Sequence, residues 1–249
     1  MVPQSRLLVT LATYNEIDNL PQLVECIRQH VEHADILVID DNSPDGTGEW
    51  ADRQATEDPH LQCLHRPRKM GLGSATLMGF QHAIDHDYAL VLNLDADFSH
   101  HPQHIPALVA AVTADEPAVD VAIGSRYIHG GGIEGWPWYR RVMSGCVNLY
   151  ARILLGLPVK DCSGSFRCYR VALLSELNFA EFYSDGYSYL EEILWRLKRG
   201  GATFSETPIV FRDRQYGASK INLREALAAI WVIFRLGLTN WLTPTKSTK

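Results

Sequence analysis

The stretch Ala89-Leu90-Val91-Leu92-Asn93-Leu94-Asp95-Ala96-Asp97 decides the fold, because a short apolar run leads directly into two carboxylates. A run of this length is typical of a strand buried in a parallel sheet. Four further apolar runs occur along the chain, at 7–12, 36–40, 61–65 and 121–124. Helical patterns separate them, at 20–31, 46–56, 74–85 and 105–113. This alternation predicts an α/β fold in which a mostly parallel central sheet is flanked by helices.

Acidic turns follow two of the predicted strands. Ligands of an open parallel sheet bind beyond the carboxyl ends of its strands, so Asp95 and Asp97 are expected at the edge of a binding cleft. Two carboxylates this close repel each other unless a cation lies between them, and Mg²⁺ or Mn²⁺ is the simplest explanation. A solvated acidic turn is the alternative. The second turn, 40–46, either caps the next helix or faces the same cleft.

The composition of the 249-residue chain excludes several classes of protein. A hydrophobic content of 46% indicates a globular chain with one sizeable core, and the formal net charge of −6 argues against a nucleic-acid partner. The five cysteines form no CxxC pair, which argues against a disulfide framework or a structural zinc site and favours a reducing compartment. No Gly-x-Gly-x-x-Gly turn follows the first strand, which argues against a dinucleotide-binding oxidoreductase.

Seven short segments form an ordered set over nearly the whole chain. They are Thr13-Tyr14-Asn15-Glu16, Asp40-Asp41-Asn42-Ser43-Pro44-Asp45-Gly46-Thr47, Gly71-Leu72-Gly73, Asp95-Ala96-Asp97, Gly124-Ser125-Arg126-Tyr127, Gly164-Ser165-Phe166-Arg167 and Arg214-Gln215-Tyr216-Gly217-Ala218-Ser219-Lys220. With these segments in this order, the chain resembles the polyprenyl-phosphate mannosyltransferases, the dolichol-phosphate mannose synthase group of the family 2 glycosyltransferases. The resemblance implies a nucleotide-diphospho-sugar transferase fold of the GT-A type, with a catalytic domain over residues 1–222.

The resemblance also implies roles for single residues. Contacts with the base and ribose of the nucleotide would come from Ala12, Tyr14, Glu16, Ile39 and Asp41. The metal would be bound directly by Asp97, with Asp95 and Ser99 completing its site and Ala96 beside the donor. The donor phosphates would be held by Arg126, Arg214 and Lys220, which with Asp97 form the catalytic set. The acceptor phosphate would be held by Arg140 and Arg141.

Three positions depart from the pattern of the resembled family. Ala12 stands where a proline is usual, which softens the turn but leaves a backbone contact possible. Ser99 stands where some relatives have glutamine, and its shorter side chain suggests a metal contact through water. Gly145 follows Ser144 where an arginine is expected, which puts one acceptor contact in doubt.

The expected reaction moves mannose from GDP-mannose to dolichyl or another polyprenyl phosphate, releases GDP, requires a metal and inverts the sugar. A lipid monophosphate has its second pKa near 6, so it is already largely an anionic nucleophile and needs little help from a base. One alternative keeps this chemistry with a UDP-sugar donor, either glucose or an N-acetylhexosamine. Another is a catalytically silent subunit with a transferase-like fold.

The carboxyl-terminal residues 223–249 are expected to form a short amphipathic helix and a tail. The apolar run at 226–242 is shorter than the roughly 20 residues that span a bilayer, so it either packs in the core or lies on a membrane surface. A polyprenyl acceptor stays in the bilayer, which favours a cytoplasmic enzyme held peripherally at the cytoplasmic face of a membrane. The sequence leaves open a small membrane subunit as a partner.

Aromatic and histidine residues near the middle of the chain have two interpretations each. Residues 130–139 are expected to form a mobile loop, in which Trp136 and Trp138 either pack in the core or meet lipid. His100 and His101 follow the acidic motif as metal ligands or, the favoured interpretation, as solvated or helix-capping residues.

Overall fold

The computed structural model describes residues 6–184, 186–213 and 223–242 of the chain. Within these residues, a seven-stranded sheet has the order β3-β2-β1-β4-β7-β5-β8. Its strands are β1 (Leu7–Thr13), β2 (Asp35–Asp40), β3 (Leu61–His65), β4 (Leu90–Asp95), β5 (Val121–Ser125), β7 (Arg167–Arg170) and β8 (Phe204–Pro208). β7 runs antiparallel to β4 and β5, and the other pairs are parallel. The five predicted strands and the mostly parallel sheet are therefore confirmed.

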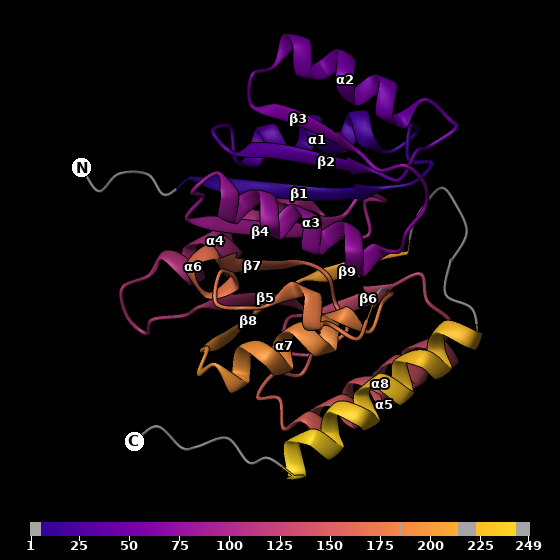
Figure 1. Ribbon diagram of the computed structural model, residues 1–249, viewed down its shortest axis with the longest axis vertical. Coiled ribbons are helices and arrows are strands. Elements are labelled where there is room, and N and C mark those ends of the chain that lie inside the picture. The colour runs from indigo at the N-terminus through magenta and orange to yellow at the C-terminus, as the bar shows by residue number, and fades with distance from the viewer. Residues whose placement is uncertain (1–5, 185, 214–222, 243–249) are drawn as a thin grey trace.

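Helices cover both faces of the sheet (Figure 1). They are α1 (Leu20–His30), α2 (Thr47–Glu57), α3 (Leu72–Asp85), α4 (Ile105–Thr113), α5 (Trp138–Leu155), α6 (Val171–Leu174), α7 (Tyr189–Arg199) and α8 (Leu223–Leu242). Short 3-10 helices, η1 (Pro102–His104) and η2 (Phe179–Glu181), add to them. A small parallel pair of strands, β6 (Gly132–Glu134) and β9 (Val210–Arg212), lies outside the main sheet. The four helices predicted between the strands are confirmed to within two residues.

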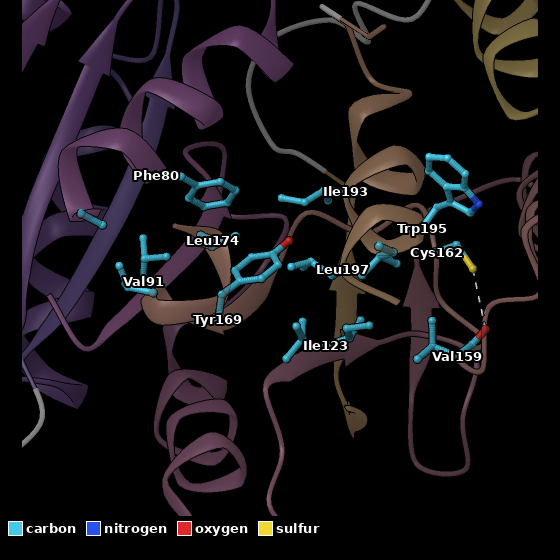
Figure 2. Packing of buried hydrophobic residues seen from close by; sticks show 14 of the residues in the cluster. Phe80, Val91, Ile123, Val159, Cys162, Tyr169, Leu174, Ile193, Trp195 and Leu197 are labelled. Atoms are coloured by element: carbon cyan, nitrogen blue, oxygen red, sulfur yellow. Dashed lines mark hydrogen bonds between the residues drawn. The ribbon is translucent and has the colours of Figure 1, made fainter. Parts of the chain in front are cut away.

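Alternate side chains of the strands enter two separate cores, because successive residues of a strand point to opposite faces. Val9, for example, packs with α1 and α4, whereas Leu8 packs on the opposite face with α3, α6 and α7. Figure 2 shows part of this second core, in which Phe80 of α3 lies against Tyr169 of β7 with ring centroids 5.1 Å apart. The two cores fix the sheet, and the sheet fixes the positions of the loops at its carboxyl edge.

The expected mobile loop at 130–139 is wrong for its last residues. Trp138 and Tyr139 lie in the first turn of α5, which is 18 residues long, and the extended Pro137 precedes them as the N-cap. Trp136 is buried, whereas Trp138 is 75% exposed. The glycines at 130–132 and the aromatic residues after them favoured a loop, and the first turn of the helix lies among those aromatic residues.

The predicted carboxyl-terminal helix is present as α8, and it packs against α5. A Cβ added to Gly237 would lie 3.1 Å from the Cβ of Leu154, so the two helices approach closely at this point. In the part of the chain that the structure describes, no helix is long and apolar enough to cross a membrane. A division of the chain at residue 222 stays a prediction.

Candidate nucleotide-sugar site

A cavity opens beyond the carboxyl ends of β1, β2 and β4, where an open parallel sheet places its ligands. Its lining includes seven of the residues expected at the site: Ala12, Tyr14, Glu16, Asp41, Asp95, Ala96 and Asp97. The lining also contains Thr13, Lys69, Gly71, Leu72, Ala75, Gly186 and Tyr187, for which the sequence predicted no contact. The two acidic turns therefore face one cleft. Ile39 is fully buried and outside this lining, so its contact with the nucleotide stays a prediction.

The neighbouring carboxylates of the second turn have different surroundings. Asp40 is buried at the end of β2, where it accepts hydrogen bonds from the hydroxyl of Thr13 (3.0 Å) and from the backbone N–H of Ser43 (2.9 Å). These bonds fasten the turn to β1. Asp41, the next residue, lines the cavity instead. Only one of the two acids is thus available to a ligand, and the sequence alone did not distinguish them.

Asp41 is held by a basic residue that the sequence analysis missed. The guanidinium of the buried Arg66 places Nη1 2.7 Å from Asp41 Oδ1, at an angle that makes the contact coulombic without a hydrogen bond. The backbone N–H of Met70 donates to Asp41 Oδ2 at 3.2 Å. Burial nevertheless raises the pKa of the Asp41 carboxyl above its usual value. Arg66 and the Met70 N–H therefore fix the position of the Asp41 carboxyl group at the cavity wall.

Hydrogen bonds join the turn after β1 to the turn after β2. The backbone N–H of Asn15 donates to the Ser43 hydroxyl at 3.0 Å, and that of Glu16 donates to the Thr47 hydroxyl at 3.0 Å. Asn15 has a left-handed φ of 59°, which the short asparagine side chain tolerates. Both turns are therefore set as one unit, and this unit presents Tyr14 and Glu16 to the cavity.

The acidic motif after β4 presents both carboxylates to the cavity. Asp97 is 7% exposed, and its Oδ1 accepts the backbone N–H of Ser99 at 3.0 Å. Phe98 between them has a φ of 59°, an unusual value for a bulky residue that tightens the turn. The Ser99 hydroxyl is buried and has no hydrogen-bond partner among the described residues. Oxygen donors of this kind suit Mg²⁺ or Mn²⁺, so the residues fit such an ion.

His100 and His101 have separate structural roles. His101 accepts a hydrogen bond from the backbone N–H of Gln103 and so caps η1, as the favoured interpretation predicted. His100 is buried between Phe166 and Phe211, with ring centroids 5.3 and 5.2 Å away, so a solvated position is wrong for it. Burial lowers the pKa of His100 to about 4. Its Nδ1 lies 3.6 Å from Asp95, and a neutral ring at that distance forms no ion pair.

Arg126, expected to hold donor phosphates, is paired with an acid. Its Nε and Nη2 donate to the two oxygens of Asp161, each at 2.7 Å, and both side chains are buried. Burial alone would raise the pKa of Asp161, but the Arg126 guanidinium lowers it below its usual value. The bidentate geometry holds Arg126 firmly, so any phosphate contact would have to use the donor atoms that Asp161 leaves. That contact stays a prediction.

The remaining predicted cations lie outside the cavity lining or outside the described residues. Arg140 places its Cζ 4.1 Å from the centre of the Trp136 ring and its Nη1 3.4 Å from Asp213. Arg141 is exposed in the same turn of α5. Arg214 and Lys220 fall in 214–222, which is not among the described residues. Arg140 and Arg141 are not in the cavity lining, and the phosphate contacts expected of all four residues stay predictions.

One cavity cation was missed by the sequence analysis. Lys69 lines the cavity, and its Nζ lies 4.6 Å from the centre of the Tyr14 ring, a cation–π contact. The sequence offered one indication of this role: Lys69 lies two residues before the Gly71-Leu72-Gly73 segment. A cation beside a glycine-rich turn at the end of a strand is a typical phosphate-binding arrangement. Lys69 is therefore a better-placed cation for a bound ligand than the paired Arg126.

Solved structures establish the class of fold. Glucosyl-3-phosphoglycerate synthase from Mycobacterium tuberculosis, in complex with Mn²⁺ and uridine-diphosphate-glucose, has a TM-score of 0.67 at 19% identity over 98% of this chain and 81% of that chain. Its complex with Mn²⁺, uridine-diphosphate and glucosyl-3-phosphoglycerate has a TM-score of 0.66, also at 19% identity, over 98% and 82%. This likeness, together with the sheet and its carboxyl-edge cavity, defines a GT-A glycosyltransferase fold.

The family follows from the sequence comparison. The model for glycosyl transferase family 2 matches residues 9–177, and the chain belongs to that family. It is a glycosyltransferase. Polyprenol monophosphomannose synthase of Mycolicibacterium smegmatis is 41% identical over 229 residues, which are 90% of this chain and 85% of that protein. Undecaprenyl-phosphate mannosyltransferase of Micrococcus luteus is 39% identical over 233 residues, 94% of each. The resemblance stated from the motifs is confirmed.

Proposed function

We propose that this glycosyltransferase moves mannose from GDP-mannose to a polyprenyl phosphate, releasing GDP and inverting the sugar. The observation that carries the proposal is the match to two relatives, each named for mannose and a polyprenol or undecaprenyl phosphate, over 85% or more of both chains. The cavity beyond β1, β2 and β4 supplies the groups that such a donor needs.

We propose that Asp41 recognises the base of the nucleotide. One edge of guanine carries two neighbouring N–H donors, at N1 and at the 2-amino group, and a carboxylate accepts both. Arg66 and the Met70 N–H hold the Asp41 carboxylate in place beside the cavity. Tyr14 and Glu16 would contact the nucleoside from the adjoining turn, and Lys69 would meet its phosphates as a charge-assisted donor.

A divalent ion, Mg²⁺ or Mn²⁺, would be held by Asp97 and Asp95, with the Ser99 hydroxyl contributing directly or through water. When bound, the ion would offset the negative charge of the leaving diphosphate. The Ser99 N–H donates to Oδ1 of Asp97 and so fixes the orientation of this carboxylate at the cavity. The buried neutral His100 packs behind the motif and adds no competing positive charge.

The reaction needs an ionised acceptor more than a base. An oxygen of the lipid phosphate attacks C1 of mannose, the bond from C1 to the diphosphate oxygen breaks, and its electron pair leaves with GDP. The acceptor phosphate is already largely ionised at neutral pH, so positioning and charge neutralisation are the tasks of the protein. Arg140 and Arg141 are proposed to hold the acceptor phosphate, and Arg214 and Lys220 the donor phosphates.

The acceptor places the enzyme at a membrane. We propose a peripheral position at the cytoplasmic face, with the catalytic domain over residues 1–222 and the carboxyl-terminal segment 223–249 nearer the lipid. A small membrane subunit is a further partner that this arrangement can accommodate.

The test is transfer of labelled sugar into organic-extractable lipid, with GDP-mannose, UDP-glucose and UDP-N-acetylglucosamine offered in parallel to vesicles containing polyprenyl phosphate. Metal-dependent incorporation from GDP-mannose is expected, with loss of the signal in EDTA. Incorporation from a UDP-sugar alone would contradict the donor, and incorporation unchanged by EDTA would contradict the metal.

A further inference from the structure

Three side chains of metal-ligating types meet between α2 and β3, outside the lining of the donor cavity. They are Asp52 of α2 and Cys63 and His65 of the edge strand β3. Each offers one ligand atom, and the three atoms all lie within 4.8 Å of one another. Among the residues that the structure describes, this is the one such group of three or more side chains. Figure 1 shows α2 and β3 at one end of the molecule.

The secondary structure explains why these side chains meet. Cys63 and His65 are alternate residues of a strand, so they leave β3 on the same face, and α2 packs against this strand. The helix approaches closely at Gly48, where an added Cβ would lie 2.9 Å from Cε1 of His65. The sequence argued against a structural zinc site because it has no CxxC pair. A site shared between a helix and a strand leaves no such pair in the sequence.

The donor atoms of the cluster are typical of a zinc site. A thiolate sulfur, an imidazole nitrogen and a carboxylate oxygen suit Zn²⁺, whereas Mg²⁺ and Mn²⁺ prefer oxygen alone. Ligand atoms of a tetrahedral zinc ion lie about 3.4–3.6 Å apart, so the three atoms have to move by roughly 1 Å at most. The side chains of His65 and Asp52 are 48% and 55% exposed, so they can make this adjustment without disturbing the core.

The electrostatic surroundings of Cys63 favour a cation. Burial raises the pKa of its thiol to about 12, and the charges of Asp52 and Asp40 act in the same direction. The same two carboxylates attract a divalent ion, which displaces the thiol proton to solvent when it binds the sulfur. Without an ion, His65 Nε2 lies 2.9 Å from Asp52 Oδ1, and a bound ion would replace this hydrogen bond.

We propose that Asp52, Cys63 and His65 bind one Zn²⁺ or a similar thiophilic divalent cation, with water as the fourth ligand, and that this ion cross-links α2 to β3. The site is separate from the metal proposed for the donor cavity. Its residues are not in the cavity lining, and its sulfur and nitrogen donors differ from the carboxylate oxygens of Asp95 and Asp97.

The cross-link would act on the two elements that support the turns of the donor cavity. α2 begins at Thr47, whose hydroxyl accepts the backbone N–H of Glu16. β3 ends at His65, and the next residue, Arg66, lies against Asp41. An ion between α2 and β3 is therefore expected to stabilise the folded chain and to hold both turns in place.

The first test uses Co²⁺ as a spectroscopic substitute for Zn²⁺ on the full, reduced chain, in an excess of Mg²⁺ that occupies sites made of oxygen alone. We expect thiolate-to-cobalt charge-transfer absorption that saturates at one ion per chain and disappears when Zn²⁺ is added. Cys63→Ser should abolish this absorption, and Cys26→Ser, a cysteine that is also partly buried, should leave it unchanged. Absence of the absorption in wild type, or its persistence in Cys63→Ser, would overturn the proposal.

A second test does not depend on the cysteine. Competition with a chelating dye measures the affinity for Zn²⁺ of Asp52→Asn and His65→Gln, with the exposed His33→Gln as control. We expect at least tenfold weaker binding in the first two variants and no change in the control. Zn²⁺ should raise the melting temperature of wild type and of the control more than that of either variant, because it binds the folded chain. Equal affinities in all four proteins, or no rise in wild type, would overturn the proposal. Neither test measures mannosyl transfer, so the outcome is independent of the proposed function.

Discussion

The amino-terminal half of the chain, residues 7–113, and the carboxyl-terminal half, residues 121–242, contribute to one sheet but use charged residues differently. In the first half Asp41, Asp95 and Asp97 follow strand ends and line the cavity. In the second half Arg126 and Asp161 are paired inside the protein. The same kinds of side chain line a cavity in the first half and stabilise the fold in the second, and the direction of each side chain decides which.

The comparison predicts that substitutions in the first half impair chemistry more than stability. The largest effect is expected for Asp97→Asn, which keeps an oxygen for the Ser99 N–H but loses the charge that would hold a metal. We expect kcat/KM for mannosyl transfer to fall about 10³-fold, roughly 4 kcal/mol, at an unchanged melting temperature. Steady-state kinetics measure it, with the exposed Asp115→Asn as control. A loss in kcat/KM of less than tenfold would contradict the role of Asp97 as a metal ligand.

The second half should show the opposite pattern. Asp161→Asn leaves the buried guanidinium of Arg126 without its counter-charge, and breaking such a pair costs about 3–5 kcal/mol of the free energy of unfolding. Asp213→Asn, at the half-exposed pair with Arg140, should cost less than about 1 kcal/mol. Urea unfolding measures both. Equal costs for the two variants would contradict the distinction drawn between buried and exposed pairs.

Lys69 sharpens the comparison within the cavity. If its ammonium meets a donor phosphate, Lys69→Ala removes a charge-assisted hydrogen bond worth about 1.5–3 kcal/mol. We expect KM for GDP-mannose to rise at least tenfold while KM for the lipid acceptor stays the same. The exposed Lys160→Ala is the matched control. A rise in KM for the lipid acceptor alone would show that Lys69 contacts the acceptor and not the donor.

Glu191 gives an effect that depends on pH. Burial raises its pKa from 4.5 to about 8, so between these values the folded chain holds a proton that the unfolded chain has lost. The free energy of unfolding should therefore fall as pH rises across this window, by at most about 1.4 kcal/mol per unit, and level off above it. Urea unfolding from pH 5 to 9 should show this slope in wild type and in Glu32→Gln but not in Glu191→Gln. Identical slopes in all three would contradict the assignment.

The sequence predicted the first half of the fold well because its signals are local. Apolar strands alternate with amphipathic helices there, and β3 and α4 begin and end where the pattern indicates. The cavity could be located because parallel strands place their carboxyl ends at one edge. Asp40 and Asp41 could not be told apart, because their roles depend on which way each side chain turns after β2.

The second half was predicted less well because its signals depend on distant residues. Arg126 was expected at a phosphate, but its partner Asp161 lies on a separate loop that only the folded sheet brings near. α5 was missed because the glycines at 130–132 and the aromatic residues at 136–139 favoured a loop, and the helix begins among them. Arg66 was missed because no feature of the sequence distinguishes a buried arginine from a solvated one.

The central claim is that the acidic cavity of the first half binds the nucleotide sugar and its metal. The most direct measurement is anomalous diffraction from crystals grown with GDP-mannose and Mn²⁺. The account predicts a manganese peak beside Asp97 and Asp95, with the guanine edge against Asp41. A manganese peak away from both carboxylates, or a nucleotide bound outside the cavity beyond β1, β2 and β4, would contradict it.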